Sequence, residues 1–234
     1  MIDETTLQRV LAVAASGGAD FAEVFAEDKR SSSAVLDDGK VEELTSGRDR
    51  GAGIRVVVGE STGFAHTADL SEASLLETAR IAAAAARGSG GGTTVAELAR
   101  VDVARPNVVA ILPGDVAKAR KVELLTRANE AARSQGAAIT QVMARYSDSR
   151  RRILVANTDG VLGEDDQVKT VFTVGTVASG DTGMQTGRQT VGHTVGFELF
   201  DQIDVEEMGR LAALQAITKL AARPAPSGQM TVVI

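Results

Sequence analysis

Two Asp-Gly pairs, each next to segments of alternating apolar residues, constrain the fold of this chain more than any other feature of its sequence. They are Asp38-Gly39 and Asp159-Gly160. Glycine tolerates the positive φ angle of a tight turn, so an Asp-Gly pair between two such segments predicts a turn between antiparallel strands. The predicted strands are 21–27, 32–36, 41–44, 51–58 and 63–67 in the first half, and 139–147, 151–156, 161–162 and 168–178 in the second.

Amphipathic helices are predicted on both sides of each run of strands. Their apolar residues recur at spacings of three and four, and the four helices are predicted to begin near Asp3, Ser71, Asp115 and Asp204. Each half of the chain therefore has the order helix, antiparallel meander, helix. This order suggests an internal structural duplication. The alternative is that two unrelated α+β domains share a common layout.

The same order predicts an α+β protein of two domains, each an antiparallel sheet or meander flanked by helices. The chain should bury its own core, and the segment Met230–Ile234 looks like the opening of a buried strand. We therefore expect a piece of a longer protein, with a natural C-terminal edge strand as the alternative. The predicted parts are a first domain at 1–88, a linker at 89–113 that follows the Gly-rich run 88–92, a second domain at 114–223, and the start of a further domain at 224–234.

The composition excludes several classes of function. There is no cysteine, so disulfides, thiol catalysis and thiolate metal ligands are excluded. A net charge of −6 and a pI of about 5.1 argue against nucleic-acid binding, and the basic clusters at Arg48, Arg50 and Arg150–Arg152 are interpreted as solvated turns. The acidic segment at the start of the sequence is not expected to act as a signal peptide, and no apolar segment approaches the roughly 20 residues that span a bilayer. We expect a cytoplasmic protein.

Several longer segments, in a fixed order, resemble the TldD/PmbA family of bacterial metallopeptidases, and the TldD branch more than the PmbA branch. GADFAEVFAED, LDDGKVEELTSGRDRGAGIRVVVG and STGFAHTADLS resemble its N-terminal module, ARYSDSRRRILVANTDG and GFELFD its middle module, and PAPSGQMTVVI the entry into its C-terminal module. They lie at 18–28, 36–59, 61–71, 144–160, 196–201 and 224–234.

The resemblance implies that the parent protein is a zinc-dependent peptidase, of a family also known as gyrase modulators, that works as a heterodimer with a TldD/PmbA-type partner subunit. The pair would enclose a chamber for unfolded peptides. An H-E-x-x-x-H helix in the C-terminal module would hold the zinc. This chain would supply chamber wall and subunit contacts. Two alternatives stay open: the parent is the metal-free PmbA-type partner, with a structural role, or the chain is a stand-alone peptide-binding module.

This chain departs from the family pattern at the zinc motif. It has two histidines, His66 and His193, and neither has a second histidine one helical turn away. A helical zinc motif needs both imidazoles on one face, so no catalytic and no metal-binding residue is predicted here. Zinc is expected in the full-length parent and no cofactor on this chain.

A Gly- and Thr-rich segment, Ser179–Thr194, is the predicted substrate contact. Glycine in a strand lets another backbone approach closely, and a peptidase that accepts any unfolded chain can hold it by main-chain pairing at a sheet edge. The predicted substrate-binding residues are Gly183, Gly187, Arg188, Gly192 and His193. The alternative is a surface hairpin without such a role.

Overall fold

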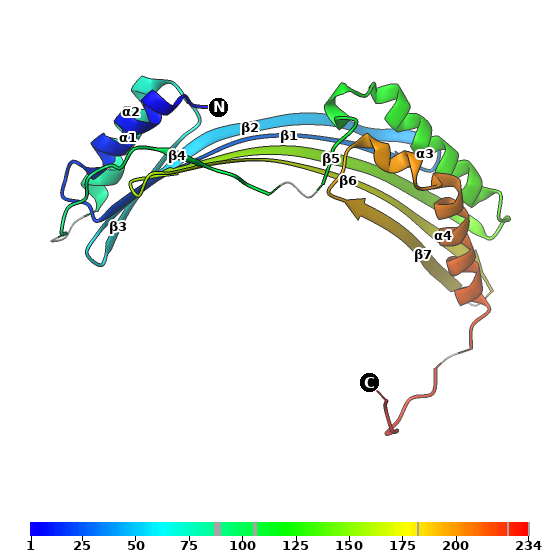
Figure 1. Cartoon of the computed structure of the whole chain (residues 1–234). Helices are drawn as coiled ribbons and strands as arrows, with labels where there is room; N and C mark the ends of the chain where they lie inside the picture. Colours follow the sequence, from blue (N-terminus) through cyan, green and yellow to red (C-terminus); the bar gives the residue numbers. More distant parts are fainter. Residues whose placement is uncertain (87–89, 105–106, 182, 224, 234) are drawn as a thin grey trace.

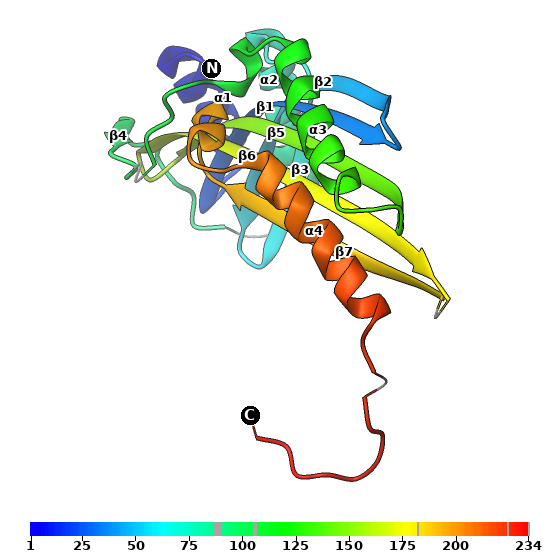
Figure 2. The ribbon, with the colours of Figure 1, turned by 90° about the vertical axis from the view of Figure 1, so that its right-hand side faces the viewer.

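The structure is a computed structural model that describes residues 1–86, 90–104, 107–181, 183–223 and 225–233 (Figure 1). One curved antiparallel sheet runs through both halves, and its helices lie at the two ends of its convex face (Figure 1). Figure 2 shows the same arch from the end that carries α3 and α4. The strands are β1 (Phe21–Asp37), β2 (Lys40–Val58), β3 (Ser61–Thr67), β4 (Ala99–Val101), β5 (Ile139–Asn157), β6 (Val161–Gly180) and β7 (Gly183–His193).

The sheet has the order β3-β2-β1-β5-β6-β4, and β7 also pairs with β6. The predicted α+β class is confirmed, but the expectation of a separate sheet in each domain is wrong. The reason is the antiparallel pairing of β1 with β5, which joins the halves from Glu23–Asn157 to Asp37–Met143. The predicted domain boundaries stay a prediction.

Pairs of short predicted strands merge into single long strands. β1, for example, continues without a break through the polar stretch between the predicted strands 21–27 and 32–36. Alternation of apolar residues stops there because neither hydrophobic core includes the middle of the sheet, whereas the backbone hydrogen bonds of the ladder persist. The clusters at Arg48, Arg50 and Arg150–Arg152 therefore lie in the middle of β2 and β5, and their interpretation as turns is wrong.

Both Asp-Gly pairs form the predicted turns. Asp38 and Gly39 have φ angles of 51° and 81°, the conformation that a two-residue hairpin needs. Gly160 has a φ of 87° between β5 and β6. The tight turns set the register of the two hairpins.

Three of the four helices begin where the sequence predicts. The structure has α1 (Glu4–Ala15), α2 (Glu72–Ala85), α3 (Lys118–Arg133) and α4 (Val205–Leu220), with short 3₁₀ turns η1 (Pro113–Asp115) and η2 (Phe197–Asp201). Asp3, Ser71 and Asp204 cap α1, α2 and α4 by accepting backbone N–H groups. α3 begins later than predicted, because Pro113–Asp115 forms η1 and Ala117 takes the N-cap position.

Two hydrophobic cores lie under the two helix pairs. The first packs α1 and α2 onto one end of the sheet around residues such as Leu7, Leu11 and Ile54. The second packs α3 and α4 onto the other end around Leu125, Tyr146 and Phe172. Between the cores, the convex face of the sheet is polar.

The strand register supports the predicted internal duplication. Ala22 pairs with Val56 in the first hairpin, and Val142 pairs with Thr176 in the second, so the second hairpin follows the first by 120 positions (142 − 22 and 176 − 56). Each half also ends with a helix that crosses an edge strand at a glycine. α2 lies against Gly63 of β3, and α4 lies against Gly187 of β7.

The predicted linker 89–113 contains the short strand β4, which pairs in parallel with β6. Gly88 and Ser89 of the predicted Gly-rich run lie outside the described residues. Further along, the Glu198 carboxylate accepts hydrogen bonds from the backbone N–H groups of Ala110 (3.2 Å), Ile111 (2.9 Å) and Gly196 (2.9 Å). Hydrogen bonds to Glu198 therefore hold the end of the linker against the start of η2.

This contact predicts a pH dependence. Burial alone would raise the pKa of Glu198, but the N–H groups of Ile111 and Gly196 hold that pKa below its ordinary value of 4.5. A lowered pKa in the folded state stabilises the fold above the unfolded value, and this stabilisation is lost as the pH falls through the folded pKa. Glu198→Gln should therefore be less stable than the wild type near neutral pH in urea denaturation. The difference should shrink below about pH 4.5, and a constant difference down to pH 3 would contradict the assignment.

In its described residues, the segment predicted to open a strand of a further domain lies outside the sheet. Met230–Val233 has no regular structure and pairs with none of the strands that the structure describes, and Val233 is 95% exposed. Pro224 and Ile234 lie outside the described residues. Among those that the structure describes, no helix is long and apolar enough to cross a membrane.

Candidate functional site

All five predicted substrate-binding residues lie on or at the start of one strand, β7, at the edge of the sheet beside β6. The structure thus brings Gly183, Gly187, Arg188, Gly192 and His193 onto one element. Arg188 pairs with Gly175 and His193 pairs with Thr170. Successive side chains in a strand point to opposite faces of the sheet, so Arg188 and His193 face opposite sides. A single extended peptide on one face would meet only one of them.

The outer edge of β7 is partly covered by α4. The Arg188 backbone N–H donates to Gln215 Oε1 at 2.7 Å, and Lys219 Nζ donates to the carbonyl oxygen of Thr186 at 2.8 Å. Two main-chain groups that a paired peptide would use are therefore already satisfied by side chains. Peptide pairing along this part of the edge requires Gln215 and Lys219 to move.

Gly187 has a structural reason to be glycine. It is buried under α4, and a Cβ atom there would overlap the carbonyl oxygen of Ala212. Thr176 Oγ1 on the neighbouring strand donates to the same carbonyl oxygen at 2.9 Å. Gly183 lies at the start of the strand with a φ of +108°, a conformation that favours glycine.

The concave face next to β7 has a hollow of about 370 Å³. Arg188 borders it together with Met143 of β5, which is 45% exposed, and Gln215 and Lys219 close its outer side. At the other end of the concave face, Phe25 and Phe64 are also exposed, and His66 stacks on Phe64 with ring centroids 6.1 Å apart. This face therefore offers apolar side chains beside hydrogen-bonding groups.

The two histidines are far apart in the sheet. His66 lies on edge strand β3 and His193 on β7, with strands β2, β1, β5 and β6 between them. Within the described ranges, no group of three or more His, Cys, Asp or Glu residues is arranged to hold a metal ion.

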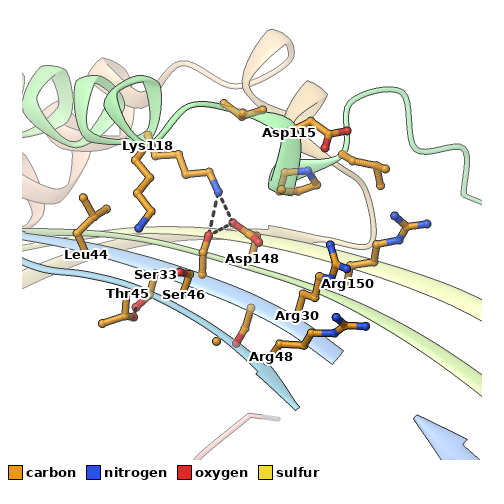
Figure 3. A pocket seen from close by; sticks show the side chains of 18 residues that line it. Arg30, Ser33, Leu44, Thr45, Ser46, Arg48, Asp115, Lys118, Asp148 and Arg150 are labelled. Atoms are coloured by element: carbon orange, nitrogen blue, oxygen red, sulfur yellow. Dashed lines mark hydrogen bonds and ion pairs between the residues drawn. The ribbon is translucent and has the colours of Figure 1, made fainter. Parts of the chain in front are cut away.

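A second hollow, about 500 Å³, lies on the convex face between the helix pairs; we call it the saddle pocket (Figure 3). Its floor is the middle of β1, β2 and β5, and its roof is η1 and the start of α3. Lys121 on α3 reaches down to the floor, where Nζ donates to Asp148 Oδ2 at 2.8 Å and to Ser32 Oγ at 2.9 Å. This ion pair is buried, with 5% and 8% of the two side chains exposed.

Tyr146 lies beneath this ion pair, with its ring centroid 4.9 Å from Lys121 Nζ. Burial raises the pKa of the Tyr146 phenol well above its ordinary value of 10.0, and the charge of Asp148 raises it further. The phenol therefore stays protonated at physiological pH. The end of the pocket floor next to the second core therefore carries no net charge, since Lys121 and Asp148 neutralise each other and the phenol is neutral.

Family models match both halves of the chain. Residues 22–86 match domain 1 of the PmbA/TldA metallopeptidases, and residues 111–220 match the central domain of these metallopeptidases. The chain belongs to the TldD/PmbA family. The resemblance inferred from the sequence is therefore confirmed.

Two curated relatives named as metalloproteases and one solved structure are similar to this chain. A metalloprotease from Methanothermobacter thermautotrophicus is 34% identical over 221 residues, which are 92% of this chain and 46% of that protein. A metalloprotease TldD homolog from Haemophilus influenzae is 28% identical over 98% of this chain and 49% of that protein. The chain thus spans about half the length of these relatives. A crystal structure from Thermotoga maritima, described as a modulator of DNA gyrase, shares the fold with a TM-score of 0.77 at 19% identity, covering 96% of this chain and 50% of that one.

The saddle pocket was not found by sequence reasoning. Its side chains come from segments more than 100 residues apart, such as Ser32 and Asp148. The sequence signal was the density of arginines between the predicted strands, at Arg48, Arg50 and Arg150–Arg152; once these segments are strands, alternation places Arg48 and Arg150 on one face. Their alignment depends on the β1–β5 register, which no local pattern encodes.

Proposed function

We propose that this chain is the non-catalytic N-terminal portion of a zinc metallopeptidase that processes unfolded peptides in the cytoplasm, together with a TldD/PmbA-type partner subunit. The observation that carries the proposal is the match of its two halves to the first and central domains of a metallopeptidase family. The zinc and the catalytic residues would lie in the rest of the parent protein.

In this proposal the concave face of the sheet serves as chamber wall. Its exposed Phe25, Phe64 and Met143 suit the apolar side chains of an unfolded peptide, and Arg188 beside its hollow suits a carbonyl or carboxylate oxygen. Backbone pairing at β7 would be confined to the ends of the strand, since Gln215 and Lys219 occupy its middle. Subunit contacts would use the rest of the same face.

A photo-crosslinking amino acid at position 188 of the full-length parent tests this role. An unfolded peptide substrate should crosslink at position 188 and not at position 80, a matched arginine on the outer surface of α2 whose side chain is 60% exposed. Equal crosslinking at both positions, or none at 188 while the parent cleaves the peptide, would refute the chamber-wall role.

Cleavage assays separate the alternatives. The full-length parent should cleave the peptide and lose activity with a chelator, whereas the chain of residues 1–234 with added Zn²⁺ should show no turnover. A parent that binds no zinc and gains activity only with a second subunit would be the metal-free PmbA-type partner. Metal-dependent turnover by the chain itself would overturn the proposal.

A further inference from the structure

Three arginines lie side by side across the central strands, on the convex face. The register pairs Arg30 of β1 with Arg48 of β2 on one side and with Arg150 of β5 on the other. Side chains directly opposite each other in antiparallel strands have Cβ atoms about 4.5–5.5 Å apart. Figure 3 shows the three side chains together at one end of the saddle pocket, on the side of Asp115. Arg30 and Arg150 are also equivalent by the duplication, since they are 120 positions apart (150 − 30).

The two outer arginines have carboxylate partners of their own. Arg48 binds both oxygens of Asp28, at 2.8 and 2.6 Å, and Arg150 binds Asp166 through Nε and a terminal nitrogen, at 2.9 and 2.5 Å. Within the described part of the chain, the Arg30 side chain makes no hydrogen bond or ion pair. The charge of Asp28 acts on Arg30, but the Asp28 oxygens are already bonded to Arg48. The central guanidinium therefore has a like charge on either side.

The roof of the pocket adds positive charge. Lys118 is the first residue of α3, is exposed, and makes no ion pair with any residue that the structure describes. Ala117 at the N-cap has no side chain to accept the first N–H groups of the helix, whose partial positive charge is left without a side-chain acceptor. Asp115 is the opposing acid on the roof, and Lys121 and Asp148 neutralise each other. The two positive charges of Arg30 and Lys118 therefore outnumber the one negative charge of Asp115, and the pocket lining has a net positive charge.

We propose that the saddle pocket binds a small molecule through a compact oxyanion group, a phosphate or a carboxylate, held by Arg30, while Lys118 at the other end of the pocket adds to its positive charge (Figure 3). Like charges directly opposite in a sheet destabilise it, so a bound oxyanion would supply the missing counter-charge. Guanidinium groups bind such oxygens in bidentate pairs, and a pocket of about 500 Å³ leaves room for the rest of a small molecule. This site lies on the convex face, whereas the proposed chamber wall is the concave face. The proposal of an oxyanion site does not rest on the chamber-wall role.

The test is calorimetric titration of the chain with inorganic phosphate and, separately, with succinate, in chloride buffer of constant ionic strength. Saturable binding of either anion is expected, and the preferred anion identifies the ligand as a phosphoryl or a carboxylate compound. Arg30→Gln should weaken the binding at least about tenfold, because a charged hydrogen-bond donor is lost. Arg80→Gln, which removes the same charge from the outer surface of α2, should leave the affinity unchanged.

A stability measurement separates binding from a structural role. In chloride buffer without phosphate or succinate, Arg30→Gln should melt at the same temperature as the wild type or higher, since the central like charge is gone. If Arg30→Gln does not fold, Arg30→Lys replaces it in the titration; it keeps the charge but loses the bidentate guanidinium and should weaken the binding several-fold. Absence of saturable binding to the wild type, or equal loss in Arg30→Gln and Arg80→Gln, would overturn the proposal.

Discussion

Replacing Lys121 with methionine is expected to lower the free energy of unfolding by about 3–5 kcal/mol, the typical loss when one partner of a buried ion pair is removed. Lys121 and Asp148 are 5% and 8% exposed, and Lys121 Nζ also donates to Ser32 Oγ at 2.9 Å. Without the ammonium group, the Asp148 carboxylate is left buried with a hydroxyl as its remaining described partner. Urea denaturation monitored by circular dichroism measures the loss.

Two controls test whether this loss comes from the unpaired charge. The double variant Lys121→Met/Asp148→Leu should recover most of the stability, because an apolar pair of similar volume avoids the cost of the buried carboxylate. Arg120→Ala breaks an exposed pair with Glu123, one residue away from Lys121, and should cost less than about 1 kcal/mol. A loss as small in Lys121→Met as in Arg120→Ala would show that the pair is not buried as described.

Replacing Gly187 with alanine is expected to lower the free energy of unfolding by about 2–3 kcal/mol, the upper part of the range for added volume in a packed core. The new Cβ atom would overlap the carbonyl oxygen of Ala212 and lie 2.9 Å from the nitrogen of Ala216. Backbone atoms cannot turn aside as a side chain can, so α4 must shift away from β7. For a chain of this size, the melting temperature should fall by roughly 4–12 °C.

Gly175→Ala is the matched control for this second prediction. Gly175 lies on the neighbouring strand β6 opposite Arg188, and a Cβ atom there meets nothing within 4 Å. This variant should therefore be about as stable as the wild type. If both variants are equally stable, then α4 does not rest on the β7 backbone. Gly187 would then be available for the substrate contact that the sequence predicts.

Helix starts and turns could be predicted from the sequence because they depend on interactions between residues that are close along the chain. Asp3, Ser71 and Asp204 cap helices as predicted, since an N-cap needs only one side chain and the next few N–H groups. The turns at Asp38-Gly39 and Gly160 follow from the left-handed conformations that these residues tolerate. The start of α3 was misplaced because Ala117 carries no capping side chain and Pro113 fits a 3₁₀ turn as well as a helix.

Prediction of the candidate sites requires contacts between residues that are far apart in the sequence. The segment with Gly183, Gly187, Arg188, Gly192 and His193 could be predicted as Gly-rich strand, but its cover by Gln215 and Lys219 could not. That cover depends on how α4 crosses the sheet, a contact made through tertiary packing. The substrate role of these residues stays a prediction.

By itself, the sequence determined the α+β class, the antiparallel hairpins, the family, and the absence of the helical zinc motif and of cysteine. Each of these depends on the order of residues along the chain. Only the tertiary structure decided that one sheet joins the two halves, and that Arg30 lies between Arg48 and Arg150. The physical reason is strand register: a slip of one residue between β1 and β5 would move these side chains to opposite faces, and only the packing of both cores fixes it.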